Sequence, residues 1–257
     1  HRCHSHYLAK GGNLRKMLAE IYGKHNGCVG GVGGSMHLQD QNVGMVSSVP
    51  IVSSAMGMAT GNALHQKREN LKDITVIYCG DASLEEGIFF ECANFASLHS
   101  LPIIFACENN LFSVYTNISE RQIDSNFKKY ASAFKIPYKR IDGNKIDEVY
   151  KTTKKIINFV RTKRKPYFVQ MDTYRYKEHC GPSDDDHLKY RNSKEVKFWQ
   201  NKDPISYAKK LLKKNKITQK KIEKLEKEIE LFVNKQFKFA ESDKLPNYRE
   251  ASKYVYV

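Results

Sequence analysis

Residues 74–110, with the sequence ITVIYCGDASLEEGIFFECANFASLHSLPIIFACENN, contain the pattern that decides the fold. Residues 74–79 and 103–107 are continuous apolar runs, as in strands that are buried on both faces. Between them, residues 85–99 show apolar side chains at helical spacing. A strand, a helix and a strand of these lengths predict a right-handed crossover between two parallel neighbours. The sequence therefore predicts an α/β fold on a parallel sheet.

Polar residues follow both predicted strands, Asp81 after the first and Asn110 after the second. Because the strands are parallel neighbours, both residues should lie at one carboxyl edge, where open α/β sheets bind ligands. Their oxygens are hard ligands that suit Mg²⁺, and the turn at Gly80, Asp81, Ala82 and Ser83 leads into a helix whose free N–H groups favour a phosphate. The pattern predicts a magnesium-bridged diphosphate. A helix-capping Asp81 and a plain turn at Asn110 would explain the same residues.

The rest of the chain continues the alternation of strand and helix. Residues 138–142 and 167–172 are expected strands, and a helix is expected between them up to about residue 161. This order predicts a doubly wound, mostly parallel sheet. From residue 205 onward the chain is helical and charged, so we expect a main domain over residues 1–204 and a C-terminal helical extension over residues 205–257.

Composition narrows the choice of function class. The 257 residues carry a net charge of +15, but the excess lysine lies toward the C-terminal half and is interleaved with glutamate, as on a solvated helix surface. We therefore expect no nucleic-acid partner. No stretch is long and apolar enough to span a membrane. The six cysteines are scattered without CxxC spacing, which predicts a reduced, cytoplasmic protein.

Several motifs carry a resemblance to a known family. Gly80-Asp81, a spacer, and Asn109-Asn110 resemble the thiamine diphosphate fingerprint, and the chain is similar to the alpha subunit of the thiamine-dependent 2-oxo acid dehydrogenases of the pyruvate dehydrogenase type. The similarity covers nearly the whole chain. It includes RCH at residues 2–4, GGSMH at residues 33–37, TYRY at residues 173–176, His179, YR at residues 190–191 and DPI at residues 203–205.

The resemblance implies the thiamine diphosphate-binding fold, and with it thiamine diphosphate and Mg²⁺ as cofactors. It implies that the metal is bound by the side chains of Asp81 and Asn110 and by the main-chain carbonyl of Phe112. The residues it implies for the thiamine diphosphate are Arg2, Val52, Gly80, Asp81, Ala82, Ser83, Asn110 and His179. Ala82 departs from the family pattern, which has glycine there, and alanine would be costly if the position needed a positive φ.

Two histidines are implied to take part in the chemistry. His179 matches a loop histidine that reaches the diphosphate and helps in acyl transfer, and residues 173–191 form a polar loop expected to act as an active-site lid. His37 follows the glycine-rich residues 27–34 and is a candidate for handling substrate or positioning the diphosphate. That loop lacks the Lys-Ser/Thr of a P-loop. Asp184, Asp185 and Asp186 are expected to face water, or to form a metal-like cluster.

The resemblance also implies the reaction and the partners. The reaction is oxidative decarboxylation of a pyruvate-like 2-oxo acid, with transfer of the acyl group to the lipoyl group of an acyltransferase component. The general-base glutamate belongs to the beta subunit, so a heterotetramer of two alpha and two beta chains is expected. The chain begins at the motif matching Arg2 and is expected to be a segment of a longer protein.

Two other functions remain open from the sequence. The N-terminal half of a split transketolase would share the fingerprint, but the loop with His179 and the Asp203-Pro204 match favour the dehydrogenase. A non-enzymatic, basic nucleic-acid-binding module would need no metal site. It would bind duplexes in a salt-sensitive way.

Overall fold

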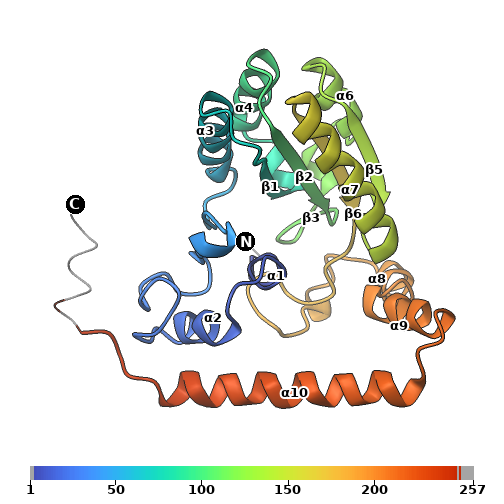
Figure 1. The fold of residues 1–257 in the computed structure, drawn as a ribbon. Coiled ribbons are helices and arrows are strands. Elements are labelled where there is room, and N and C mark those ends of the chain that lie inside the picture. The colour runs from blue at the N-terminus through green and yellow to red at the C-terminus, as the bar shows by residue number, and fades with distance from the viewer. Residues whose placement is uncertain (1–2, 248, 250–257) are drawn as a thin grey trace. The chain divides into compact units, whose positions relative to one another are not determined.

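The computed structural model describes residues 3–247 and 249. The chain divides into two compact units, one made of residues 1–51 with residues 216–257 and the other of residues 52–215. The larger unit contains the main sheet, and the smaller contains helices and irregular chain (Figure 1).

The main sheet of the larger unit has four strands in the order β1-β2-β6-β5, and all neighbours are parallel. The strands are β1 (Thr75–Gly80), β2 (Ile103–Asn109), β5 (Tyr138–Asp142) and β6 (Tyr167–Asp172). They lie where the sequence predicted strands. The predicted parallel pairing of the first two is confirmed, with Gly80 beside Glu108 in the register.

Helices cover both faces of this sheet (Figure 1). On one face, Phe105 and Cys107 of β2 pack in a core with α3 (Ala55–Arg68) and α4 (Gly87–Leu98). On the other face, Ile104 and Ala106 pack with α7 (Ile146–Lys163). Alternate side chains of β2 thus enter different cores, which explains its continuous apolar run. The predicted α/β, doubly wound architecture is confirmed.

The predicted crossover helix has the apolar face that the sequence indicated. Phe89, Cys92, Ala93 and Ala96 of α4 are all buried. In α7, by contrast, Tyr150 is 66% exposed. Helical spacing predicts an inner face of α7 that includes Ile146, Tyr150 and Val160. This prediction was partly wrong, because the side of the helix that contacts the sheet carries Ile156 and Val160.

Shorter elements complete the larger unit. A two-stranded antiparallel hairpin follows β2, and two short helices come before β5. These elements are β3 (Phe112–Ser113), β4 (Thr116–Asn117), α5 (Ile118–Arg121) and α6 (Phe127–Ala133). After β6 come a long loop, α8 (Ser193–Gln200) and α9 (Pro204–Lys214).

The smaller unit is built on α2 (Leu14–Ile21) and the long α10 (Gln219–Ser242). The Asn13 side chain caps α2, accepting from the Lys16 N–H at 3.2 Å. Arg15 holds α2 against α10, since its guanidinium stacks over Phe239 and donates to Gln236 at 3.0 Å. The unit also contains α1 (His4–Ala9) and a short 3₁₀ turn, η1 (Gln41–Val43).

The helical C-terminal region is confirmed, and it is shared between the units, with α9 in the larger and α10 in the smaller. The division into residues 1–204 and 205–257 stays a prediction about domains. Apolar residues recur at helical spacing along α10, and of these Ile222 is buried, whereas Leu225 and Ile229 are half exposed. Among the described residues, no helix is both long and apolar enough to cross a bilayer.

All six cysteines are free thiols, and they lie at different depths. Cys79 and Cys107 are register partners on β1 and β2, and both are buried. Burial raises the pKa of the Cys107 thiol well above its ordinary value, with the neighbouring Cys79 as a further cause. Cys180, on the loop after β6, is exposed.

Candidate functional site

The two predicted metal-binding side chains come from neighbouring strand ends. Asp81 directly follows β1 and opens a 3₁₀ turn, η2 (Asp81–Leu84), and Asn110 directly follows β2. Since Gly80 pairs with Glu108 in parallel register, Asp81 and Asn110 leave the sheet at the same carboxyl edge. The structure confirms the predicted placement of the two residues at this edge.

The chain after Asn110 turns back toward the Asp81 turn. The Asn110 side-chain oxygen accepts from the Phe112 N–H at 2.9 Å, and Leu111 between them has a left-handed φ of 70°. This turn starts β3, and β3 contacts η2. The element carrying Phe112 is therefore next to the element carrying Asp81, so the three predicted metal ligands belong to adjoining segments.

Asp81 is buried and has a cationic partner that the sequence did not reveal. Only 1% of Asp81 is exposed, and its carboxylate forms an ion pair with Arg121 at the end of α5. Arg121 also forms an ion pair with Glu85. Forty positions separate Asp81 from Arg121, and no local spacing relates them. Only the folded chain shows this contact.

The expected cofactor residue Val52 lies close to the same turn. Its neighbour Ser53 is buried, has a left-handed φ of 62°, and donates its hydroxyl to the Ser83 carbonyl at 2.7 Å. This bond ties the segment before α3 to η2. Val52 is 43% exposed, which leaves its surface accessible to a ligand.

The backbone of the turn has room for a ligand and is not strained at Ala82. A Cβ added to Gly80 would meet no atom within 4 Å. Ala82 is not among the described residues with positive φ, so its methyl group carries no left-handed strain. The cost that the sequence suggested for alanine here is therefore absent.

The donor chemistry of the turn suits a hard cation. Asp81 offers carboxylate oxygens, Asn110 an amide oxygen and Phe112 a main-chain carbonyl. Within the described residues, no group of three or more His, Cys, Asp and Glu side chains could hold a metal ion. Of the predicted metal ligands, only Asp81 belongs to these residue types. Metal binding would therefore also need the Asn110 amide oxygen, the Phe112 carbonyl and oxygens from a ligand.

The smaller unit holds His37 beside a glycine-rich loop organised by a buried glutamate. The Glu20 side chain accepts from the backbone N–H groups of Val29, Gly31 and Gly33 at 2.8, 2.9 and 2.6 Å. His37 lines a hollow of about 700 Å³ along this loop. No motif in the sequence marks Glu20 for this role. Arg2 lies outside the described residues, and its role stays a prediction.

The loop after β6 starts at the same edge of the sheet, as expected. The Thr173 N–H donates to the Asn109 carbonyl at 2.9 Å, which places the start of the loop beside the end of β2. His179 lies half-buried in this loop. Its contact with a diphosphate stays a prediction, as do the assigned roles of His37 and Val52.

A buried ionic cluster holds the second half of this loop. Asp185 is 2% exposed and accepts from Arg191 at 2.6 Å, from Arg175 at 3.4 Å and from the Tyr190 hydroxyl at 2.7 Å. Burial by itself raises the pKa of Asp185, but the Tyr190 hydroxyl and the two guanidinium charges outweigh it and hold that pKa below its ordinary value. For Asp185, the expectation of a water-facing aspartate was wrong.

The Asp185 cluster also fixes the loop to the turn after Asn110. Arg175 donates to the carbonyl of Val114, between β3 and β4. Asp184 and Asp186, in contrast, are exposed as expected. No spacing in the sequence selects the buried member, because Arg175 and Arg191 converge on Asp185 only after folding.

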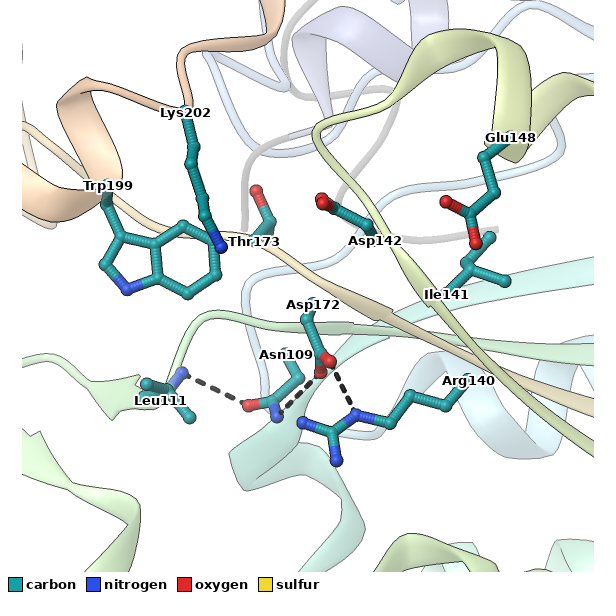
Figure 2. Close-up of a pocket in the computed structure, with 10 residues that line it drawn as sticks. All are labelled: Asn109, Leu111, Arg140, Ile141, Asp142, Glu148, Asp172, Thr173, Trp199 and Lys202. Atoms are coloured by element: carbon teal, nitrogen blue, oxygen red, sulfur yellow. Dashed lines mark hydrogen bonds and ion pairs between the residues drawn. The ribbon is translucent and has the colours of Figure 1, made fainter.

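A second hollow lies at the carboxyl edge of β2, β6 and β5 and has a volume of about 420 Å³. Figure 2 shows Asp172 between Asn109 and Arg140 in this hollow. Asn109 donates to Asp172 at 3.4 Å, and Arg140 donates to it at 2.5 Å. Trp199 and Lys202 form another part of the wall. Asn109 is thus occupied in joining strand ends, whereas its neighbour Asn110 belongs to the turn near Asp81.

Comparison with known proteins gives a consistent result. Residues 1–249 match the family model described as "Dehydrogenase E1 component". The chain is 33% identical over 263 residues to the chloroplastic pyruvate dehydrogenase E1 component subunit alpha-3 of Arabidopsis thaliana, covering 100% of this chain and 61% of that protein. It is 30% identical over 258 residues to the pyruvate dehydrogenase E1 component subunit alpha of Rickettsia bellii, covering 100% and 78%.

Solved structures show weaker likeness. A transketolase from Campylobacter jejuni matches with a TM-score of 0.46 and 20% identity, over 54% of this chain and 22% of that one. A putative thiamin diphosphate-dependent enzyme from Mycobacterium smegmatis matches with a TM-score of 0.38 and 18% identity, over 47% and 22%.

Proposed function

Since this chain belongs to the dehydrogenase E1 component family, we propose that it is the alpha subunit of a thiamine diphosphate-dependent 2-oxo acid dehydrogenase. The proposed reaction is oxidative decarboxylation of a pyruvate-like 2-oxo acid, followed by acyl transfer to a lipoyl group. The chain spans 61% of its plant relative and 78% of its Rickettsia relative, both of which are named as alpha subunits of pyruvate dehydrogenase E1.

The observation that carries this proposal is the parallel register of β1 and β2, which brings Asp81 and Asn110 to one sheet edge. The contact of β3 with η2 adds the Phe112 carbonyl to the same neighbourhood. Carboxylate, amide and carbonyl oxygens fit Mg²⁺. The free space at Gly80 and the unstrained backbone at Ala82 fit a diphosphate held near the turn.

In the proposed enzyme, this chain binds and orients the cofactor. Asp81, Asn110 and Phe112 would hold the metal, and Gly80, Ala82 and Ser83 would face the diphosphate together with Arg2. Val52 would support the aminopyrimidine ring. Bound thiamine diphosphate supplies an electron sink for the carbon–carbon bond cleavage. His179 and His37 are proposed to contact the reacting groups, and the loop that carries His179 to exclude water.

The proposed partners complete the site. A beta subunit would supply the general-base glutamate, in a heterotetramer of two alpha and two beta chains, and a lipoyl-bearing acyltransferase component would receive the acyl group. We propose neither a nucleic-acid nor a membrane partner. A cytoplasmic location is part of the proposal, and cell fractionation tests it.

A thermal-shift series with the partner chain present tests the proposal. Thiamine diphosphate with Mg²⁺ should raise the melting temperature of the wild-type complex, and Asp81→Ala should abolish the increase. Asp142→Ala, at the end of β5 on the same sheet edge, is the matched control and should keep it. An equal shift in wild type and Asp81→Ala would contradict the assignment of the metal site.

An activity assay separates the dehydrogenase from its rivals. The co-expressed subunits should decarboxylate pyruvate, branched-chain oxo acids or a longer analogue, whereas a split transketolase would transfer a two-carbon unit from a ketose donor. Salt-sensitive binding of duplex DNA without any cofactor effect would instead favour the basic binding module. The family match over residues 1–249 supports the dehydrogenase over both rivals.

A further inference from the structure

Arg121 bridges two carboxylates at the turn after β1. One guanidinium nitrogen donates to Asp81, another donates to Glu85, and Nε donates to the Thr116 carbonyl at 3.2 Å. The side chains of Arg121 and Asp81 are 11% and 2% exposed, and that of Glu85 is 30% exposed. Arg121 therefore forms an ion pair with the same carboxylate that the proposed function assigns as a metal ligand.

A buried carboxylate requires hydrogen-bond donors or a compensating positive charge, because removing an unpaired charge from water is very costly. Arg121 provides that charge here. A divalent cation on Asp81 would provide it equally well, and two cations close to one carboxylate repel each other. Arg121 and the metal ion are thus alternative partners of Asp81.

Arg121 has a second ion-pair partner, Glu85, close to its contact with Asp81. Glu85 is more exposed than Asp81 and can keep the guanidinium paired after its contact with Asp81 is lost. Gln122 donates to the same Glu85 oxygen at 2.7 Å, which holds that carboxylate beside α5. Releasing Asp81 would therefore leave no buried guanidinium without a partner.

We propose that Arg121 is the resident counter-ion of Asp81 in the metal-free protein and competes with the divalent cation for it. Metal binding then requires Arg121 to transfer fully to Glu85. This inference rests on the proposed function, since it assumes that Asp81 is a metal ligand. It assigns Arg121 the role of a positioning residue that sets the metal affinity and holds the Asp81 carboxylate in place beforehand.

The test measures Mn²⁺ binding to the complex with its partner chain, at one saturating concentration of thiamine diphosphate, by electron paramagnetic resonance of the free ion. Arg121→Gln removes the competing charge and should tighten Mn²⁺ binding about tenfold, the order expected when one ion pair no longer has to be broken. Arg121→Lys retains the positive charge without the planar guanidinium, so its Mn²⁺ affinity should lie between those of the wild type and Arg121→Gln. If the glutamine variant does not fold, the lysine variant decides.

The matched control is Arg140→Gln, which removes an arginine paired with Asp172 at the same sheet edge. It should leave Mn²⁺ affinity unchanged. Unchanged or weaker binding in both Arg121 variants, while Asp81→Ala abolishes binding, would overturn the competition and leave the proposed function standing. Equal binding by wild type and Asp81→Ala, or none in any variant, would overturn both.

Discussion

Two buried aspartates in the larger unit are paired with arginines in different ways. Asp81 is bound by one arginine, Arg121, which also contacts the partly exposed Glu85. Asp185 is bound by Arg175 and Arg191, and their side chains are 5% and 1% exposed. Each arrangement neutralises a carboxylate that is almost inaccessible to water.

The difference lies in what would happen if a partner left. Arg121 has a second carboxylate within reach, so its pair with Asp81 is exchangeable. Arg191 also pairs with the exposed Asp186 at 2.9 Å, but backbone carbonyls fix it in place, those of Arg175 and Tyr176 at 2.5 and 2.8 Å. Losing Asp185 would leave the buried guanidinium of Arg175 without that carboxylate. We infer that the first pair serves binding and that the second pair holds the loop.

The largest expected effect comes from breaking the second pair. Asp185→Ala leaves two buried guanidinium groups without their shared carboxylate and should lower the free energy of unfolding by about 3–5 kcal/mol. Urea denaturation followed by circular dichroism measures this. The control Asp184→Ala removes an exposed partner of Lys177 and should change stability by less than about 0.5 kcal/mol. Equal effects of the two changes would contradict the comparison.

A third buried carboxylate extends the comparison to a site held by neutral donors. Glu20→Ala removes the acceptor of three backbone N–H groups in the glycine-rich loop. We expect a loss of about 2–3 kcal/mol, because those donors must then find water. Denaturation of Glu20→Ala and of Glu230→Ala, an exposed glutamate on α10, tests this expectation. A loss as small as in the control would show that the loop does not depend on Glu20.

The pH dependence of stability sharpens the role of Asp185. Its folded-state pKa lies below the unfolded value, so its contribution is complete above the unfolded pKa of about 3.9 and is lost as the pH falls through the lower, folded pKa. Tyr190→Phe removes one donor and should move the acid-induced loss to higher pH, with a cost of about 1 kcal/mol at neutral pH. Urea midpoints between pH 2 and 7 measure it. An unchanged profile would contradict the role of the hydroxyl.

The smallest effect is expected at the turn beside Asp81. Ala82 has no left-handed strain, so Ala82→Gly, which restores the family pattern, should lower stability by about 0.5–1 kcal/mol through the greater freedom of glycine in the unfolded chain. Denaturation of the single variant measures this. Stabilisation by the change would show that the alanine is strained.

The sheet was predictable because its evidence is local. The runs at residues 74–79 and 103–107 have the apolar character that two-sided burial requires, and the helix between them fixes their direction. The placement of Asp81 and Asn110 at one sheet edge can therefore be predicted without knowledge of tertiary contacts.

The ionic partners were not predictable in the same way. Arg121 meets Asp81 from an element beyond the next strand, and nothing in its own surroundings marks it as different from other arginines. Among Asp184, Asp185 and Asp186, the sequence contains no pattern that selects the buried member. That selection depends on where Arg175 and Arg191 converge after folding.

Because the free thiols differ in burial, their reaction rates can report which part of the protein unfolds locally. Cys180 is exposed on the loop that Asp185 holds, whereas Cys107 is buried on β2, an inner strand of the sheet, where burial raises its pKa and shields the sulfur from reagents. A thiol-reactive dye should label Cys180 within the native state and Cys107 only after the sheet has come apart. Labelling rates would thus time motions of the loop and of the core separately, without any engineered probe.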